Sequence, residues 1–87
     1  MRIKRHSKIN GIVQAIKIDC EGSITIPKEI MQVNDIEPLE QVHVLNKNNG
    51  NRFITYAIEG DEFCLNGAAT RQGIIGDKII ILTYHII

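Results

Sequence analysis

Short segments in which β-branched residues alternate with other side chains constrain the fold of this chain more than any other feature. The segments GIVQAIKI (11–18), QVHVLN (41–46) and RFITYAI (52–58) show this alternation. Successive side chains of a strand point to opposite faces, so a period of two predicts strands with one buried face. A fourth segment, KIIILTYHII (78–87), is an almost continuous apolar run, typical of a strand buried on both faces. The chain is therefore predicted to be mainly β.

Turn-forming residues separate these segments. The stretch NKNNGN (46–51) contains an Asn-Gly pair, which favours left-handed backbone geometry and predicts a hairpin between 41–46 and 52–58. The stretches EGDE (59–62) and GIIGDK (73–78) predict further turns. One short helix is predicted over PKEIMQV (27–33), with its proline at the first helical position.

A weak internal sequence similarity, called the echo below, suggests how the strands are arranged. LEQVHV (39–44) is similar to GDKIII (76–81), and a turn precedes each segment. Two similar halves around a pseudo-two-fold axis would give a small closed β-barrel. Closure removes the exposed sheet edges that are a hazard for a short β chain.

Length, charge and cysteine content exclude several classes of protein. A chain of 87 residues with 44% hydrophobic residues is expected to form one domain, 1–87. Its ten basic and ten acidic side chains cancel, so no overall charge would gather nucleic acid or a membrane surface. No apolar run reaches membrane-spanning length, and a cytoplasmic location is expected. The two cysteines, Cys20 and Cys64, do not have metal-ligand spacing, and no metal site is predicted.

The pair Gly22-Ser23 in EGSITI (21–26) admits two interpretations. The simpler one is a turn that leads into a strand. In the other, the Ser23 hydroxyl attacks the Gly22 carbonyl and forms an ester, from which elimination releases the upstream segment. The former serine then becomes a pyruvoyl group, a ketone able to form a Schiff base with an amine and to accept electrons, as pyridoxal does.

Two further groups of residues carry candidate chemistry. By the period of two, Arg52, Ile54 and Tyr56 share one strand face, where Arg could bind a carboxylate and Tyr could donate a proton. A rim arginine beside a half-buried tyrosine is the structural alternative. The small residues of NGAA (66–69) would let a ligand approach backbone N–H groups, or would start a tightly packed helix.

Together, the blocks EGSITI, NGNRFITYAI, LNGAA and GDKIIILTY closely resemble the pyruvoyl-dependent aspartate 1-decarboxylases, in order and over nearly the whole chain. The resemblance implies a six-stranded double-psi β-barrel with short helices, assembled as a homotetramer. It implies autocatalytic cleavage between Gly22 and Ser23, with a covalent pyruvoyl group made from Ser23 as the cofactor. The implied reaction is decarboxylation of L-aspartate to β-alanine for pantothenate biosynthesis, with no nucleic-acid or membrane partner.

The resemblance also implies roles for individual residues. Ser23 would be the pyruvoyl precursor, and Thr55 would hydrogen-bond the Gly22 carbonyl and promote the acyl shift. Arg52 and Lys8 would bind substrate carboxylate, and Tyr56 would return a proton to the substrate carbanion. The pyruvoyl group and substrate would be positioned by Asn66, Gly67, Ala68 and Ala69.

Two positions depart from the family pattern. Asn10 stands where the family usually has histidine, and Cys20 where it often has tyrosine. These changes leave the cleavage residues intact and affect the side of the site expected to meet substrate. A barrel relative that acts on another amino acid, or is inactive, therefore stays open as an alternative.

A DNA-binding protein is the alternative from another class. SITIPKEIMQVNDIEPLEQVHV (23–44) is also similar to the swapped-hairpin domain of antitoxins and transition-state regulators. Such a dimer needs an arginine-rich face for phosphates. Residues 18–45 contain no arginine and more acidic than basic side chains, and this alternative leaves RFITY and NGAA unexplained.

Overall fold

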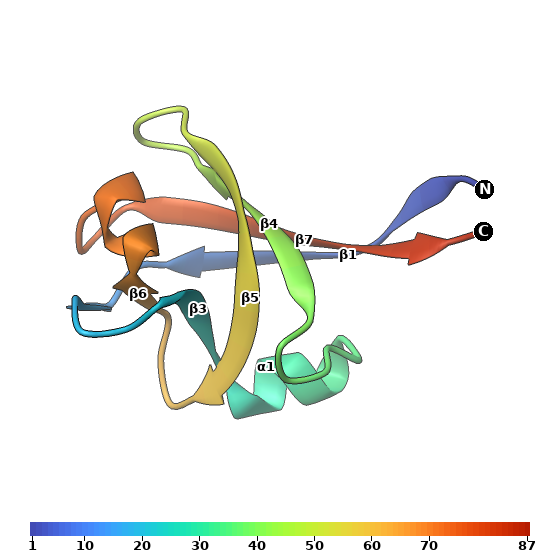
Figure 1. Ribbon diagram of the computed structural model, residues 1–87, viewed down its shortest axis with the longest axis horizontal. Helices are drawn as coiled ribbons and strands as arrows, with labels where there is room; N and C mark the ends of the chain where they lie inside the picture. Colours follow the sequence, from blue (N-terminus) through green and yellow to red (C-terminus); the bar gives the residue numbers. More distant parts are fainter.

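The chain is mainly β in a computed structural model that describes all of residues 1–87 (Figure 1). This confirms the class predicted from the alternating segments. Helix α1 (Lys28–Val33) and the 3₁₀-helix η1 (Ala68–Gln72) are short. The strands are β1 (Ile3–Ile12), β2 (Ala15–Lys17), β3 (Gly22–Pro27), β4 (Gln41–Asn46), β5 (Arg52–Gly60), β6 (Cys64–Gly67) and β7 (Lys78–Ile86).

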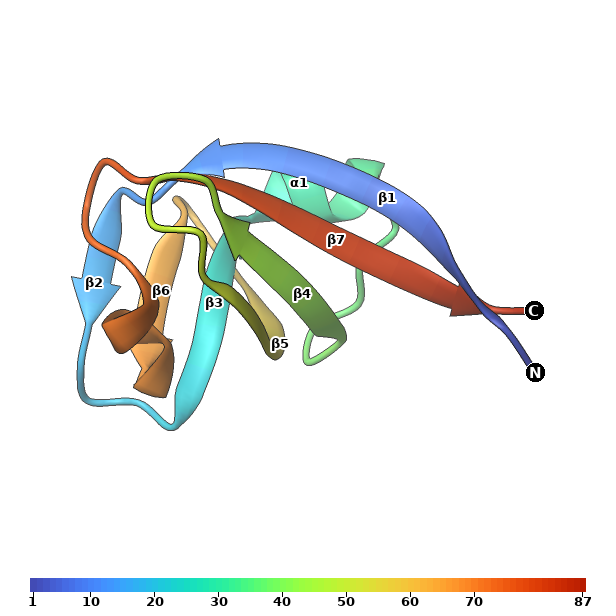
Figure 2. The same cartoon turned by 90° about the horizontal axis from the view of Figure 1, so that it is seen from above.

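The strands form one 7-stranded sheet in the order β1-β7-β4-β5-β3-β6-β2. Its two outer strands, β1 and β2, are consecutive in the chain and joined through Val13 and Gln14, so the sheet curves back toward its own start. Figure 2 shows β1 and β7 running together toward the termini, away from β2, β3 and β6. No ladder joins β1 to β2, and the predicted closed barrel of six strands is therefore not confirmed.

The predicted strand over 11–18 is wrong in its extent, because Val13 and Gln14 divide it between β1 and β2. The Val13 N–H donates to the Asp77 carbonyl, and the Gln14 N–H donates to the Phe63 carbonyl. The Gln14 side-chain Oε1 accepts from the Phe63 N–H at 2.9 Å. These bonds satisfy backbone groups that would otherwise need a strand partner.

The internal echo corresponds to a pair of neighbouring strands. β4 and β7 are antiparallel, and Val44 pairs with Ile81, its equivalent in the echo. The echo begins at Leu39 and Gly76, which both have positive φ angles of 69° and 97°. A two-fold axis that passes between equivalent positions makes two strands antiparallel, so this register supports the predicted pseudo-two-fold relation.

The predicted hairpin is confirmed. Gln41 pairs with Tyr56 and Leu45 with Arg52, and Gly50 in the turn has a φ of 78°. β5 continues to Gly60, so the first half of the predicted 59–62 turn belongs to the strand.

The predicted helix is present but begins one residue later. Pro27 is the last residue of β3 and the N-cap of α1, with φ −52° and ψ 134°. Its ψ is extended, so the first helical residue is Lys28.

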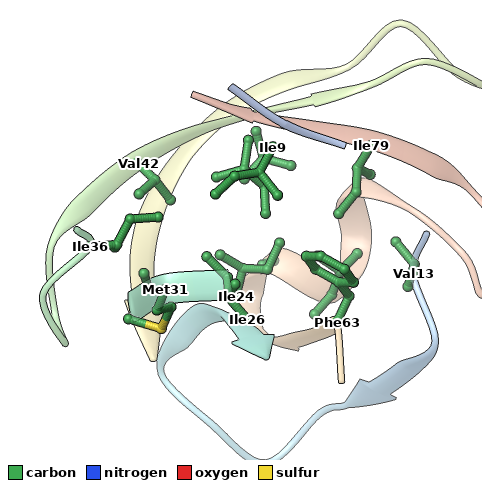
Figure 3. Close-up of a cluster of buried hydrophobic side chains, with 14 residues drawn as sticks. Ile9, Val13, Ile24, Ile26, Met31, Ile36, Val42, Phe63 and Ile79 are labelled. Atoms are coloured by element: carbon green, nitrogen blue, oxygen red, sulfur yellow. The ribbon is translucent and has the colours of Figure 1, made fainter. Parts of the chain in front are cut away.

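The core lies inside the curve of the sheet (Figure 3). It is a cluster of 14 buried residues, of which Ile24 and Ile26 of β3 are fully buried. Because side chains alternate along a strand, Ser23 and Thr25 point to the opposite face of β3. Burial of the two isoleucines therefore determines where the Ser23 hydroxyl is presented.

The helices of the structure are too short and too polar for any of them to span a membrane.

A buried polar contact ties the hairpin turn to the segment before β7. Asn46 Nδ2 donates to Asp77 Oδ2 at 2.8 Å and to the Gln72 carbonyl at 3.1 Å. The Ile74 N–H also donates to Asp77 Oδ2, at 3.0 Å. The Asn46 side chain, and then the Ile74 N–H, lower the pKa of Asp77 because both hydrogen bonds favour the charged carboxylate.

This lowered pKa predicts a pH-dependent contribution to stability. A carboxyl group with a depressed folded-state pKa stabilises the fold above its unfolded pKa, about 3.9, and loses that contribution as the pH falls through the folded value. Asp77→Asn should therefore lower the melting temperature at pH 7, and the difference from wild type should shrink toward pH 2. Thermal unfolding of both proteins across this range measures it. A difference in melting temperature that stays the same from pH 7 to pH 2 would contradict the assigned role of the Asp77 carboxylate.

Candidate active site

Gly22 and Ser23 lie at the start of β3, opposite the end of β6. In this antiparallel pair, Gly22 faces Gly67 and Ser23 faces Asn66. Gly22 has a φ of 155°, in a region that side-chain-bearing residues rarely adopt. The Gly-Ser pair therefore belongs to the mouth of a strand, and its backbone conformation requires the glycine.

The Asn66 side chain holds the Ser23 hydroxyl. Asn66 Nδ2 donates to Ser23 Oγ at 3.0 Å and to Thr25 Oγ1 at 2.9 Å. Asn66 is 2% exposed, whereas Ser23 is half-buried. A buried amide with fixed partners is a rigid donor, so the Ser23 oxygen has a defined direction.

The backbone of 67–68 lies directly against the residues before Ser23. Gly67 has a φ of 56°, and a Cβ placed there would be 2.0 Å from the Cys20 carbonyl oxygen. The Ala68 N–H donates to the Glu21 carbonyl at 3.4 Å, and Thr70 Oγ1 donates to the Gly67 carbonyl at 2.7 Å. The small residues predicted to approach a ligand thus also make room for the chain segment before the Gly22-Ser23 bond.

A cavity of about 280 Å³ opens beside Gly22. β3 and β5 are parallel, and their pairing starts at Ile24 and Ala57. Gly22 and Thr55 precede these two residues by the same number of positions, so they are at equivalent places on neighbouring strands. Both line the cavity, although no hydrogen bond joins them in this structure. The other lining residues are Phe53, Ile54, Tyr56, Ala68, Ala69 and Gln72.

The predicted face of β5 exists and is exposed. Arg52, Ile54 and Tyr56 all lie on the outer face, and Tyr56 is 49% exposed. Tyr56 reaches the rim of the Gly22 cavity, but Arg52 does not line it. Lys8 is exposed on β1, and β7, β4 and β5 lie between β1 and β3.

Comparison with known proteins identifies the family. A sequence model of the aspartate decarboxylase family matches residues 1–87. This chain belongs to the aspartate decarboxylase family. The whole-chain match favours this assignment over a swapped-hairpin DNA-binding domain, whose similarity was confined to one segment.

Individual relatives in the family support the assignment. The aspartate 1-decarboxylase of Dehalococcoides mccartyi strain CBDB1 is 60% identical over 74 residues, which cover 80% of this chain and 60% of the relative. That of Thermoanaerobacter pseudethanolicus is 50% identical over 90 residues, covering 98% of this chain and 77% of the relative. That of Desulfotalea psychrophila is 44% identical over 88 residues, covering 97% and 71%. The match thus spans 60%, less than two thirds, of the length of the D. mccartyi relative.

The two departures from the aspartate decarboxylase pattern lie in different places. Asn10 lines a separate hollow of about 460 Å³, together with Gln14 and Phe63. Cys20 is exposed, and its carbonyl is the group that leaves no room for a side chain at Gly67. Of these two residues, therefore, only Cys20 lies next to the Gly22-Ser23 bond of the same chain.

Two members of the polar cluster were not singled out from the sequence. Thr25 and Cys64 both contact the Asn66 amide, with Cys64 Sγ 3.3 Å from Asn66 Oδ1. Each lies two residues from a predicted site residue, Ser23 or Asn66, on the same strand. The period of two identifies both when it is applied to the strand that carries Ser23 and to the strand that carries Asn66.

Proposed function

We propose that this chain cleaves itself between Gly22 and Ser23 and then decarboxylates L-aspartate to β-alanine, the reaction that supplies pantothenate biosynthesis. The observation that carries the proposal is the Ser23 hydroxyl, held by a buried amide beside a glycine with a conformation that few other residues adopt. Membership of the aspartate decarboxylase family supplies the reaction class.

The cleavage step uses only groups of the chain itself. Ser23 Oγ attacks the Gly22 carbonyl carbon, the C–N bond breaks, and an ester forms as the serine nitrogen takes up a proton. Elimination then leaves a Gly22 carboxylate and a dehydroalanine, which hydrolyses to a pyruvoyl group and ammonia. In the first step the Asn66 N–H stabilises charge that develops on Oγ, and Thr55 is proposed to donate to the Gly22 carbonyl.

The residues around Ser23 fit a pyruvoyl group made from it. Asn66 offers two N–H donors on one face of β3, and the methyl side chains of Ala68 and Ala69 leave the cavity beside Gly22 open. When formed, the group supplies a ketone that binds the substrate amine and draws electrons from the Cα–CO2 bond.

Tyr56, Arg52 and Lys8 are proposed to act on the substrate. Tyr56, at the rim of the cavity, would deliver a proton to the substrate Cα. Arg52, on the same exposed face, would bind a carboxylate through paired hydrogen bonds. Lys8 is exposed on β1 and does not line the Gly22 cavity of the same copy, and its carboxylate contact is proposed to come from another copy in a homotetramer.

We also propose that the chain folds as the six-stranded double-psi β-barrel of the family. The register of β4 against β7, which pairs equivalent residues of the echo, supports it. The two cysteines are free, as is usual in the cytoplasm, where we place the reaction.

The proposal is tested by intact-mass spectrometry followed by CO2 release. Purified protein should give two fragments, of which the larger begins with a pyruvoyl group. This matured protein should release CO2 from L-aspartate, and more slowly from L-glutamate or small amino acids. Tyr56→Phe should mature normally and lose about 100- to 10,000-fold in turnover, the usual range for a proton donor.

Tyr84→Phe is a matched control, because the Tyr84 hydroxyl contacts His43 at 3.1 Å, away from the Gly22 cavity. It should leave turnover unchanged. No CO2 from L-aspartate by fully matured protein would reject this substrate but leave self-cleavage intact. A single uncut chain would reject both.

A further inference from the structure

The buried thiol of Cys64 is a hydrogen-bonding group near Ser23 to which the proposed reaction gives no role. In the β3–β6 pair, Ser23 faces Asn66 and Thr25 faces Cys64. The period of two places these four side chains on one face of the pair. Cys64 is 3% exposed and Asn66 is 2% exposed. The thiol thus lies in a polar cluster that includes the proposed nucleophile.

Each hydrogen-bonding group of the Asn66 amide has a partner in this cluster. Its nitrogen donates to Ser23 Oγ and Thr25 Oγ1. Its oxygen accepts from the Cys64 thiol, whose sulfur is 3.3 Å away. The same sulfur is 3.6 Å from the Leu65 carbonyl. The thiol has one hydrogen, and the shorter contact assigns it to Asn66.

Cys64 remains a thiol under neutral conditions. Burial raises the pKa of Cys64, because the charged thiolate would be poorly solvated there. Lys17 opposes this shift through its charge. The sulfur therefore keeps the hydrogen that it offers to Asn66 Oδ1.

We infer that Cys64 is a positioning residue for self-cleavage, and that its S–H group fixes the Asn66 amide that holds Ser23 Oγ. With both N–H groups directed at hydroxyl oxygens, the Ser23 hydroxyl hydrogen is free to leave toward a base while Oγ keeps its direction. Without the thiol, a buried amide oxygen has no donor. The side chain would then be held on one side only and could turn its oxygen toward the two hydroxyls.

The inference rests on the proposed cleavage at Gly22-Ser23, and variants of Cys64 test it. Cys64→Ala removes the donor, and the cleavage rate should fall about three- to tenfold, the usual effect of one hydrogen bond. Cys64→Ser keeps a donor of similar size and should restore the rate to within about twofold of wild type. The appearance of the two fragments is followed by intact mass. Equal slowing in both variants, or none in Cys64→Ala, would overturn the inference.

A matched control separates positioning from general destabilisation. Ile81→Val removes one methyl group from the fully buried core of β7, away from this cluster, and typically costs about 0.5–1.5 kcal/mol of stability. It should cleave at the wild-type rate. Slowing as large as that of Cys64→Ala would assign the effect to stability and overturn the inference.

A second measurement does not depend on cleavage. In the uncut Ser23→Ala background, Asn66 is held by Thr25 and Cys64 alone. Nitrogen relaxation of the Asn66 side-chain amide should show a rigid group with Cys64 or with Cys64→Ser, and a mobile one with Cys64→Ala. Equal rigidity in all three proteins would overturn the inference even where cleavage is confirmed. If wild type did not cleave, the proposed function would fail while this measurement still tested the contact.

Discussion

Ser23→Ala should leave a single uncut chain of 87 residues, where the wild-type protein should yield two fragments. The substitution removes the only atom, Oγ, that the proposed reaction uses to attack Gly22. It also removes one of the two hydroxyl acceptors of the Asn66 amide. Core residues Ile24 and Ile26 are untouched, so the variant should fold. Intact mass after prolonged incubation measures the result, and two fragments from this variant would refute self-cleavage by Ser23.

Thr25→Ala is the matched control, because Thr25 is the other hydroxyl held by Asn66 Nδ2, at 2.9 Å. It should still cleave to completion.

Thr55→Val tests the other residue proposed for the cleavage step. It keeps the side-chain shape but removes the hydroxyl proposed to polarise the Gly22 carbonyl. Loss of one such donor typically costs roughly 100- to 1,000-fold in rate. Cleavage at an unchanged rate in Thr55→Val would exclude Thr55 from the step.

Gly67→Ala should slow cleavage by about 100-fold or more, because the added methyl group meets backbone rather than flexible side chain. Its Cβ would lie 2.0 Å from the Cys20 carbonyl oxygen and 2.5 Å from the Cys20 carbonyl carbon. The segment 20–21 must then move, and Gly22 moves with it. Displacement of a reacting group by about 1 Å can cost about 100-fold in rate. The fraction cleaved over time, measured alongside thermal unfolding, tests this.

Gly50→Ala is the control for backbone strain alone. Gly50 also has a positive φ, 78°, but a Cβ there would have nothing within 4 Å. A left-handed conformation costs an alanine about 1–2 kcal/mol, so this variant should be destabilised and still cleave at the wild-type rate. Normal cleavage in Gly67→Ala, or equal slowing in both variants, would contradict the proposed close approach at Gly67.

Local sequence patterns were sufficient to predict the hairpin, the short helix and part of the site, but not every strand: the segment 11–18 is divided between β1 and β2, and β6 was not predicted. The period of two in 41–46 and 52–58, with Asn-Gly between them, predicted the hairpin of β4 and β5. The same period placed Arg52, Ile54 and Tyr56 on one face, which the structure shows to be exposed. These predictions succeeded because alternation and turn geometry depend on the backbone of neighbouring residues. The start of α1 was wrong by one residue, because the extended ψ of Pro27 continues β3.

Only the tertiary structure decided which distant residues meet. Ser23 and Asn66 come together because β3 and β6 pair in one particular register, and burial of Ile24 and Leu65 on the other face holds that register. The same register brings Thr25 and Cys64 to the Asn66 amide. The order of the strands likewise placed Lys8 on β1, outside the lining of the Gly22 cavity. The sequence by itself determined the β class, the hairpin and the Gly22-Ser23 pair. Strand register and order, which depend on packing between distant segments, determined the surroundings of that pair.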